Sequence, residues 1–167
     1  MAARLQIFRI EKESHLADAF NGEGARLWGG RWNSPGLPAV YCSQSLSLAL
    51  LEILVHAGTL EERADPRVWF SISLPRAAAL AITARSLPPS WNLPAFNPAT
   101  AALGDAWLRG NRSVALRVPS VLLPGEWNYL LNPGHPAFRK QVVCSKPQRL
   151  EIDPRIPTPP GLAACRT

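Results

Sequence analysis

The residues best suited to chemistry lie in a loop rich in Trp, Gly and Arg and in the apolar helix that follows it. The loop, Trp-Gly-Gly-Arg-Trp-Asn over residues 28–33, combines backbone that can approach a ligand closely with a guanidinium that can hold an anion. In the helix, Glu52 is the only charged side chain before His56. A carboxylate on such a helix loses much of its water, which is costly unless it is hydrogen-bonded or used by a ligand.

Two interpretations of Glu52 remain open from its position alone. The carboxylate can be structural, paired with Arg9, Arg26 or Arg31, because buried ion pairs also occur for structural reasons. It can instead serve a ligand. The neighbouring loop favours this second interpretation, since its glycines and arginines suit an anionic ligand that carries a ring. The same loop can also be an ordinary turn whose Trp side chains close the core.

The side chains gathered here allow one class of chemistry that needs no metal. Arginines can hold a pyrophosphate through paired hydrogen bonds, and the ring of Tyr41 can stack on a nicotinamide or purine face. A carboxylate such as Glu52 can orient a ribose hydroxyl and stabilise an oxocarbenium-like transition state as a glycosidic bond breaks. The sequence contains no phosphate-binding P-loop, no dinucleotide-binding glycine fingerprint, no zinc-protease motif and no C-x-x-C pair.

The composition indicates one globular domain. A chain of 167 residues buries roughly two-thirds of its unfolded surface. The net charge of +6 admits nucleic acid, a phosphate-bearing ligand or an acidic protein, but no Lys/Arg cluster or DNA-binding motif supports nucleic acid. No apolar run reaches the roughly 18 residues that a membrane span requires, and residues 1–10 lack the apolar core of a signal peptide. We therefore expect a cytoplasmic protein.

Apolar periodicity predicts the elements that position these side chains. Alternation predicts a strand over residues 5–10, with Arg9 near its end, and a second strand over residues 39–42, which carries Tyr41. The segment 22–38 between them is predicted to be a long loop, and long loops in compact domains are often binding loops.

Two helices are predicted from the same patterns. Residues 46–57 are apolar almost all round, so we expect a helix that is buried broadly, with Ser43 or Ser45 as its cap. Asn97-Pro98 is a suitable cap and first position for a second helix, which runs to about Arg109.

Further strands are predicted at residues 68–74, 113–118, 126–132, 142–143 and 150–152. The order of elements is strand, helix, several strands, one more helix and more strands. Such an order favours a mixed α+β domain over a doubly wound fold.

Several short motifs follow one another along nearly the whole chain: Phe8-Arg9-Ile10, Gly30-Arg31-Trp32-Asn33, Val40-Tyr41, the helix with Ala49, Glu52 and His56, Pro119-Ser120, residues 128–132 and residues 150–155. In this order they resemble the RES domain family, which supplies the toxins of RES–Xre toxin–antitoxin pairs. The resemblance implies an ADP-ribosyltransferase-like fold, an α+β domain whose split mixed sheet holds NAD in a central cleft. We expect this domain to span residues 1–155, followed by a Pro-rich tail over residues 156–167.

The resemblance also implies roles for individual residues. Glu52 matches the family's Glu and would be the principal catalytic group. Arg31 looks like the loop Arg that grips the pyrophosphate or assists catalysis, and Tyr41 would position the nicotinamide end. Ser120 matches a later Ser that faces the nicotinamide side. An ordinary structural role is the alternative for each. His56 is a supporting candidate only, and for it the structural role at the helix end is favoured.

The NAD-binding set implied by the resemblance adds Arg9 and Asn128 to Arg31, Tyr41 and Ser120. Arg9 looks like the strand-end Arg that meets the phosphate or ribose, and Asn128 is a supporting candidate. No metal site is predicted.

The activity implied by the resemblance is cleavage of NAD at the nicotinamide–ribose bond, with a cognate Xre-type antitoxin as the neutralising partner. The acceptor stays open, because a protein target would make the chain an ADP-ribosyltransferase, phosphate an NAD phosphorylase and water a glycohydrolase. Nucleic acid would be reached only through the antitoxin, and no membrane is involved. The alternative is a non-catalytic module whose Arg/Trp loop and apolar helix form a protein-docking groove.

Overall fold

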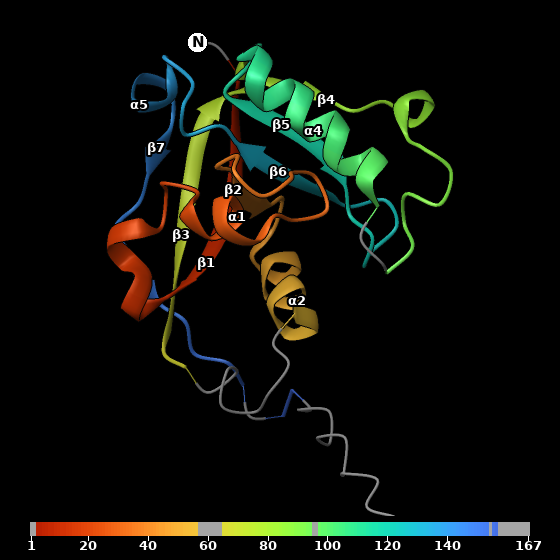
Figure 1. The fold of residues 1–167 in the computed structure, drawn as a ribbon. Coiled ribbons are helices and arrows are strands. Elements are labelled where there is room, and N and C mark those ends of the chain that lie inside the picture. The colour runs from red at the N-terminus through yellow and green to blue at the C-terminus, as the bar shows by residue number, and fades with distance from the viewer. Residues whose placement is uncertain (1–2, 57–64, 95–96, 154, 157–167) are drawn as a thin grey trace, which may run out of the picture.

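The computed structural model describes residues 3–56, 65–94, 97–153 and 155–156. Eight strands of this part form one mixed sheet, in the order β4-β5-β6-β2-β1-β3-β7, with β8 paired to β3 (Figure 1). The strands are β1 (Arg4–Lys12), β2 (Val40–Ser43), β3 (Arg67–Pro75), β4 (Ala79–Ala81), β5 (Ala115–Pro119), β6 (Trp127–Leu131), β7 (Val143–Cys144) and β8 (Gln148–Arg149). Only β4 and β5 run parallel; the other pairs are antiparallel.

The sheet has two well-paired halves that meet at a narrow junction. β1 and β3 pair in register from Arg4 opposite Pro75 to Lys12 opposite Arg67, while β2, β5 and β6 form the other half. Between the halves, the register of β1 and β2 contains one pair, Phe8 opposite Ser43. The two strands therefore part beyond this pair, and that opening is where the candidate site lies.

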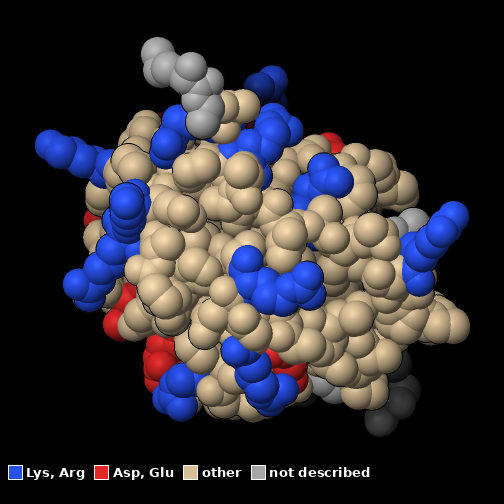
Figure 2. Space-filling view, turned by 90° about the horizontal axis from the view of Figure 1, so that it is seen from above, with Lys and Arg blue, Asp and Glu red and all other residues tan. Residues whose placement is uncertain are grey.

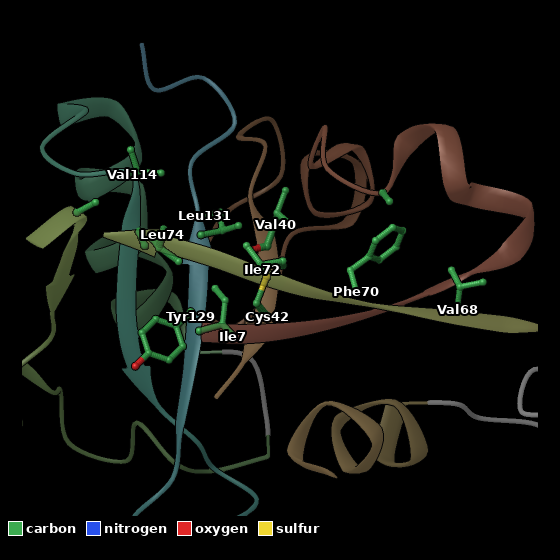
Figure 3. Close-up of a cluster of buried hydrophobic side chains, with 13 residues drawn as sticks. Ile7, Val40, Cys42, Val68, Phe70, Ile72, Leu74, Val114, Tyr129 and Leu131 are labelled. Atoms are coloured by element: carbon green, nitrogen blue, oxygen red, sulfur yellow. The ribbon is translucent and has the colours of Figure 1, made fainter. Parts of the chain in front are cut away.

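The two faces of the sheet carry separate apolar clusters, because successive side chains of a strand point to opposite faces. In β6, Tyr129 and Leu131 join the larger cluster, which is drawn in Figure 3, whereas Leu130 joins the cluster under α4 (Pro98–Gly110). The predicted alternation of the strand over residues 68–74 is confirmed, since its alternate apolar side chains Val68, Phe70, Ile72 and Leu74 are all buried.

The helix α4 begins as predicted. The Asn97 side chain accepts a hydrogen bond from the Ala99 N–H at 2.9 Å, and Pro98 occupies the first turn, where no amide donor is needed. Gly104 lets α4 lie against the Trp32 backbone, because a Cβ at this position would stand 1.7 Å from the Trp32 carbonyl oxygen.

The helix α2 (Leu46–His56) packs on β1 and β2 and is capped by Ser45, whose Oγ accepts from the Leu48 N–H at 3.1 Å. Position 57, the predicted last residue of this helix, lies outside the described residues. The prediction of broad burial was wrong: Leu51 and Val55 are 38% and 61% exposed. One face of α2 covers the sheet, and no described element covers its other face (Figure 1).

Two other predictions need correction. The segment 22–38 is not all loop, because Glu23–Trp28 forms the short helix α1, which begins after the left-handed Gly22 and carries a Glu23–Arg26 ion pair. The last strand is Gln148–Arg149, not residues 150–152, since these are the residues that pair with Val68 and Trp69 of β3. The strand β4 and the short helix α5 (Phe138–Gln141) were not predicted.

Charged side chains do not form one continuous basic surface on the face drawn in Figure 2, where Lys and Arg are separated by uncharged residues. In the described part of the chain, no helix combines the length and apolar character that crossing a membrane requires.

Candidate functional site

A cavity of about 170 Å³ opens where β1 and β2 part and α2 crosses them. Its walls come from three segments that are distant in sequence: Phe8, Arg9 and Ile10 of β1, Tyr41 and Cys42 of β2, and Ala49, Glu52, Ile53 and His56 of α2. Three of the predicted site residues, Arg9, Tyr41 and Glu52, are thus brought together around one space.

Glu52 lines this cavity and is held by an amide. Its Oε1 accepts a hydrogen bond from Asn128 Nδ2 at 2.6 Å, and its side chain is 25% exposed. Its Oε2 lies 3.7 Å from His56 Nε2, at the exposed end of α2. Among the described residues, Glu52 does not pair with any of the three arginines that were considered. Arg9 and Arg26 pair with Glu11 and Glu23, and Arg31 donates to the Trp91 carbonyl oxygen.

Arg9 spans the opening between the two halves of the sheet. Its Nη1 donates to the Tyr41 carbonyl oxygen at 2.8 Å, and its Nη2 pairs with Glu11. Its Nε is buried and has no hydrogen-bond partner among the described residues. Because Arg9 lines the cavity and its side chain is only 17% exposed, its guanidinium is a suitable site for an anionic or hydroxyl-bearing ligand.

The ring of Tyr41 forms part of the cavity wall, while its hydroxyl points into the Trp/Gly/Arg loop. The hydroxyl donates to Asn33 Oδ1 at 2.8 Å and accepts from the Trp32 N–H at 3.1 Å. Burial raises the pKa of Tyr41 far above its usual value, against the Trp32 hydrogen bond and the charge of Arg31, which lower it. The phenol is therefore neutral, and the chemistry available to Tyr41 is that of a fixed ring.

Asn33 fixes the loop that holds Tyr41, and sequence reasoning missed this role. Its side chain is fully buried, and its Nδ2 donates to the carbonyl oxygens of Ala25 and Leu37 at 2.9 and 3.0 Å. Gly30 completes the contact, because a Cβ there would stand 2.5 Å from the Tyr41 hydroxyl oxygen. The signal available in the sequence was the Gly-Arg-Trp-Asn motif itself, which contains both residues.

Arg31 and Ser120 do not line the cavity. Arg31 Nη1 donates to the Trp91 carbonyl oxygen at 2.8 Å. Ser120 is buried, and its Oγ accepts from the N–H groups of Leu122 and Leu123, both at 3.2 Å. Both side chains therefore have structural contacts, and their predicted roles toward a ligand stay predictions.

Cys42 is the other titratable group in the wall besides those predicted. Burial raises the pKa of its thiol to about 12, so it carries no thiolate near neutral pH. Within the described residues, no group of three or more His, Cys, Asp or Glu side chains is placed to hold a metal ion.

A second, larger hollow of about 340 Å³ lies where β3 begins and β8 ends, lined by Asp65, Pro66, Arg67 and residues 149–152. It contains none of the predicted site residues and no aromatic ring. Of these two, the smaller cavity is the better candidate, since its wall combines a carboxylate, an aromatic residue and a guanidinium.

The sequence profile of the RES domain matches residues 6–153, which include every residue of the cavity wall. The chain belongs to the RES domain family. It is 37% identical over 150 residues to the protein named Toxin Res of Photorhabdus laumondii, covering 90% of this chain and 96% of that one. It is 34% identical over 151 residues to the Prs ADP-ribosylating toxin of a Sphingobium strain, covering 87% and 91% of the two chains.

A third relative of this RES domain is the MbcT toxin of Mycobacterium tuberculosis. A stretch of 37 residues, 22% of this chain and 20% of that one, is 51% identical to the protein named NAD(+) phosphorylase MbcT. The crystal structure of the MbcT–MbcA toxin–antitoxin complex matches the fold with a TM-score of 0.71 and 22% identity, over 90% of this chain and 86% of that one. The fold of this RES domain is therefore shared with a solved toxin.

Proposed function

We propose that this chain is a toxin that binds NAD as substrate and cleaves it at the nicotinamide–ribose bond. The observation that carries the proposal is the position of Glu52, a partly buried carboxylate that lines a cavity with Tyr41 and Arg9 and is held from behind by Asn128. The names of the relatives support the choice of NAD, since one is an ADP-ribosylating toxin and another an NAD(+) phosphorylase.

The size of the cavity suggests which part of the substrate it receives. At about 170 Å³ it is smaller than the roughly 300–1,000 Å³ of pockets that enclose drug-sized ligands, so it suits the nicotinamide and its ribose and not the whole dinucleotide. The apolar side chains of Phe8, Ile10 and Ile53 and the ring of Tyr41 fit the flat nicotinamide ring. The pyrophosphate would then lie near the mouth, within reach of Arg9.

In the proposed reaction, the bond between ribose C1″ and the nicotinamide nitrogen breaks, and its electron pair leaves with neutral nicotinamide. Positive charge grows on the ribose, and the Glu52 carboxylate stabilises it, because an opposite charge fixed beforehand costs no reorganisation during the reaction. An acceptor then forms a bond to C1″ and loses its proton. Water, phosphate and a protein side chain all satisfy this scheme, so the site residues alone do not select among them.

The proposed partner is a protein antitoxin of the Xre type, through which any contact with nucleic acid would occur. The supporting observations are the toxin–antitoxin complex of the structural neighbour and the exposed apolar side chains of α1 and α2. Leu51 and Val55 of α2 and Trp28 of α1, which is 84% exposed, are suited to contact with a protein.

The test is to incubate the purified chain with NAD, with and without inorganic phosphate, and to measure released nicotinamide. Release only with phosphate, giving ADP-ribose-1″-phosphate, assigns a phosphorylase; release without it, giving ADP-ribose, assigns a glycohydrolase. Label from NAD on one cellular protein assigns a transferase. Absence of both nicotinamide release and labelled protein contradicts the proposal.

A further inference from the structure

Ser43 has a buried hydroxyl next to the candidate site. The sequence predicted no role toward a ligand for this residue. It is the last residue of β2 and is 4% exposed. In the pairing of β2 with β6 it stands directly opposite Asn128, so both side chains lie on the same face of the sheet. Its Oγ donates to Asn128 Oδ1 at 2.7 Å.

These contacts form a chain of hydrogen bonds that ends at the carboxylate of Glu52. Ser43 donates to the carbonyl oxygen of Asn128, and the amide nitrogen of Asn128 donates to Glu52 Oε1 at 2.6 Å. The direction follows from chemistry, because an ionised carboxylate only accepts hydrogen bonds and the amide must turn its NH₂ toward it. The amide oxygen then faces Ser43, whose hydroxyl must donate.

The polar residues that follow Ser43 have other contacts, so the bend between β2 and α2 does not depend on the Ser43 hydroxyl. Ser45 caps α2, and the Gln44 side chain accepts from the Trp127 N–H at 3.1 Å. Among the described residues, the Ser43 side chain forms its hydrogen bond with Asn128. A buried hydroxyl directed at an amide fixes that amide in one of its two orientations.

We propose that Ser43 is a positioning residue for the reaction, acting through Asn128 on Glu52. The inference rests on the proposed function, in which Glu52 meets the ribose. Without the hydroxyl, the amide oxygen of Asn128 loses its donor, the amide is free to turn, and Glu52 loses the bond that holds its Oε1. A misplaced carboxylate stabilises the transition state less, so kcat falls more than the KM for NAD rises.

The matched pair of variants is Ser43→Thr and Ser43→Val. Both side chains have the same shape and suit a strand, but only Thr keeps the hydroxyl, so any steric strain is common to both. Ser43→Ala removes the hydroxyl without adding bulk. Loss of one buried hydrogen bond corresponds to a change of about tenfold in rate. We expect Val and Ala to lower kcat about tenfold relative to Thr, with a melting temperature for Val only about 2–4 °C below that of Thr, as the loss of one hydrogen bond implies.

Two outcomes overturn the inference while the wild type releases nicotinamide. One is that Thr and Val are equally slow while Ala is fast, because bulk and not the hydroxyl would then matter. The other appears in a double-mutant cycle: if Ser43→Val slows the Asn128→Ala variant as much as it slows the wild type, Ser43 does not act through Asn128. We expect little further loss in that background.

Crystal structures of the Thr and Val variants test the positioning role of Ser43 independently of the proposed function. We expect the Glu52 carboxylate to keep its place in the Thr variant and to shift or become disordered in the Val variant. An unmoved Asn128–Glu52 contact in the Val variant contradicts the positioning role. Absence of nicotinamide release by the wild type would instead count against the proposed function.

Discussion

Two sets of polar residues differ in how many of their hydrogen-bonding atoms are already used by contacts within the protein. Around the cavity, the buried Nε of Arg9 has no hydrogen-bond partner among the described residues, and Glu52 Oε2 lies 3.7 Å from His56 Nε2. Behind it, the Asn33 amide, the Arg31 Nη1 and the Ser120 hydroxyl are bound to backbone groups. The contrast teaches that residue type alone does not identify a site. A candidate site needs both a place in a cavity wall and hydrogen-bonding atoms that the fold has not already used.

The largest effect on activity is expected for Glu52, which lines the cavity. We expect Glu52→Gln to lower the rate of nicotinamide release by about 100-fold or more, since removal of one such stabilising group costs about 10²–10³ in kcat. The melting temperature should change little, because Gln keeps the shape of Glu. Glu23→Gln, on the exposed surface of α1, is the control and should be as active as the wild type.

Arg31 tests whether a residue that does not line the cavity nevertheless contacts the ligand. We expect Arg31→Ala to abolish toxicity in cells and to raise the KM for NAD about 10- to 100-fold, as for the loss of a charge-assisted hydrogen bond. The variant should stay folded by circular dichroism. Full toxicity would confine Arg31 to its contact with the Trp91 carbonyl oxygen and would make the sequence-based assignment wrong.

Gly104 tests how far stability depends on the close packing of α4 against the Trp32 backbone. We expect Gly104→Ala to lower the free energy of unfolding by about 2 kcal/mol or more, because its Cβ would meet the Trp32 carbonyl oxygen at 1.7 Å and force α4 away from the loop. Gly24→Ala is the matched control, since a Cβ there has nothing within 4 Å. Denaturant titration compares them, and equal stability would show that α4 does not depend on this close approach.

Ser120 tests whether a residue outside the cavity wall contributes to stability alone. We expect Ser120→Ala to lower the free energy of unfolding by about 1 kcal/mol, through the loss of the hydrogen bonds from Leu122 and Leu123. Nicotinamide release by the folded fraction should be close to that of the wild type. A lower kcat at unchanged stability would support the direct role that the resemblance implied.

The smallest effect concerns alkaline pH and Cys42. Because burial raises the pKa of this thiol to about 12, the folded chain keeps the proton that the unfolded chain releases, and stability falls as pH rises. At the ordinary pKa of the thiol, we expect a loss of about half a kcal/mol, which Cys42→Ala should remove. Denaturant titrations at neutral pH and at pH 9 would measure it. An identical pH dependence in the variant contradicts the burial of this thiol.

The sequence predicted local features well and distant contacts poorly. The cap at Asn97 and the alternation of β3 depend on neighbours within a few residues, and both are confirmed. The prediction that α2 is buried broadly was wrong, because the burial of a helix face depends on which other elements pack on it, and the sequence of the helix does not show this. The strand β4 was missed because three residues carry too little periodicity.

The same limit applies to the site. Glu52 was identified as the charged side chain of an apolar helix, and the resemblance assigned roles to Arg9 and Tyr41. The structure places all three around one cavity. The contact between Glu52 and Asn128 joins residues 76 positions apart, so no pattern along the chain reveals it. The Ser43–Asn128 pair depends on strand register, which is fixed by the whole sheet and not by either strand alone.

The most direct measurement is a crystal structure of the Glu52→Gln variant soaked with NAD. We expect the nicotinamide and its ribose in the cavity between β1, β2 and α2, with a ribose hydroxyl within hydrogen-bond distance of residue 52 and the pyrophosphate toward Arg9. NAD bound in the hollow beside Arg149, or anywhere that leaves residue 52 out of contact with the ribose, would contradict this expectation.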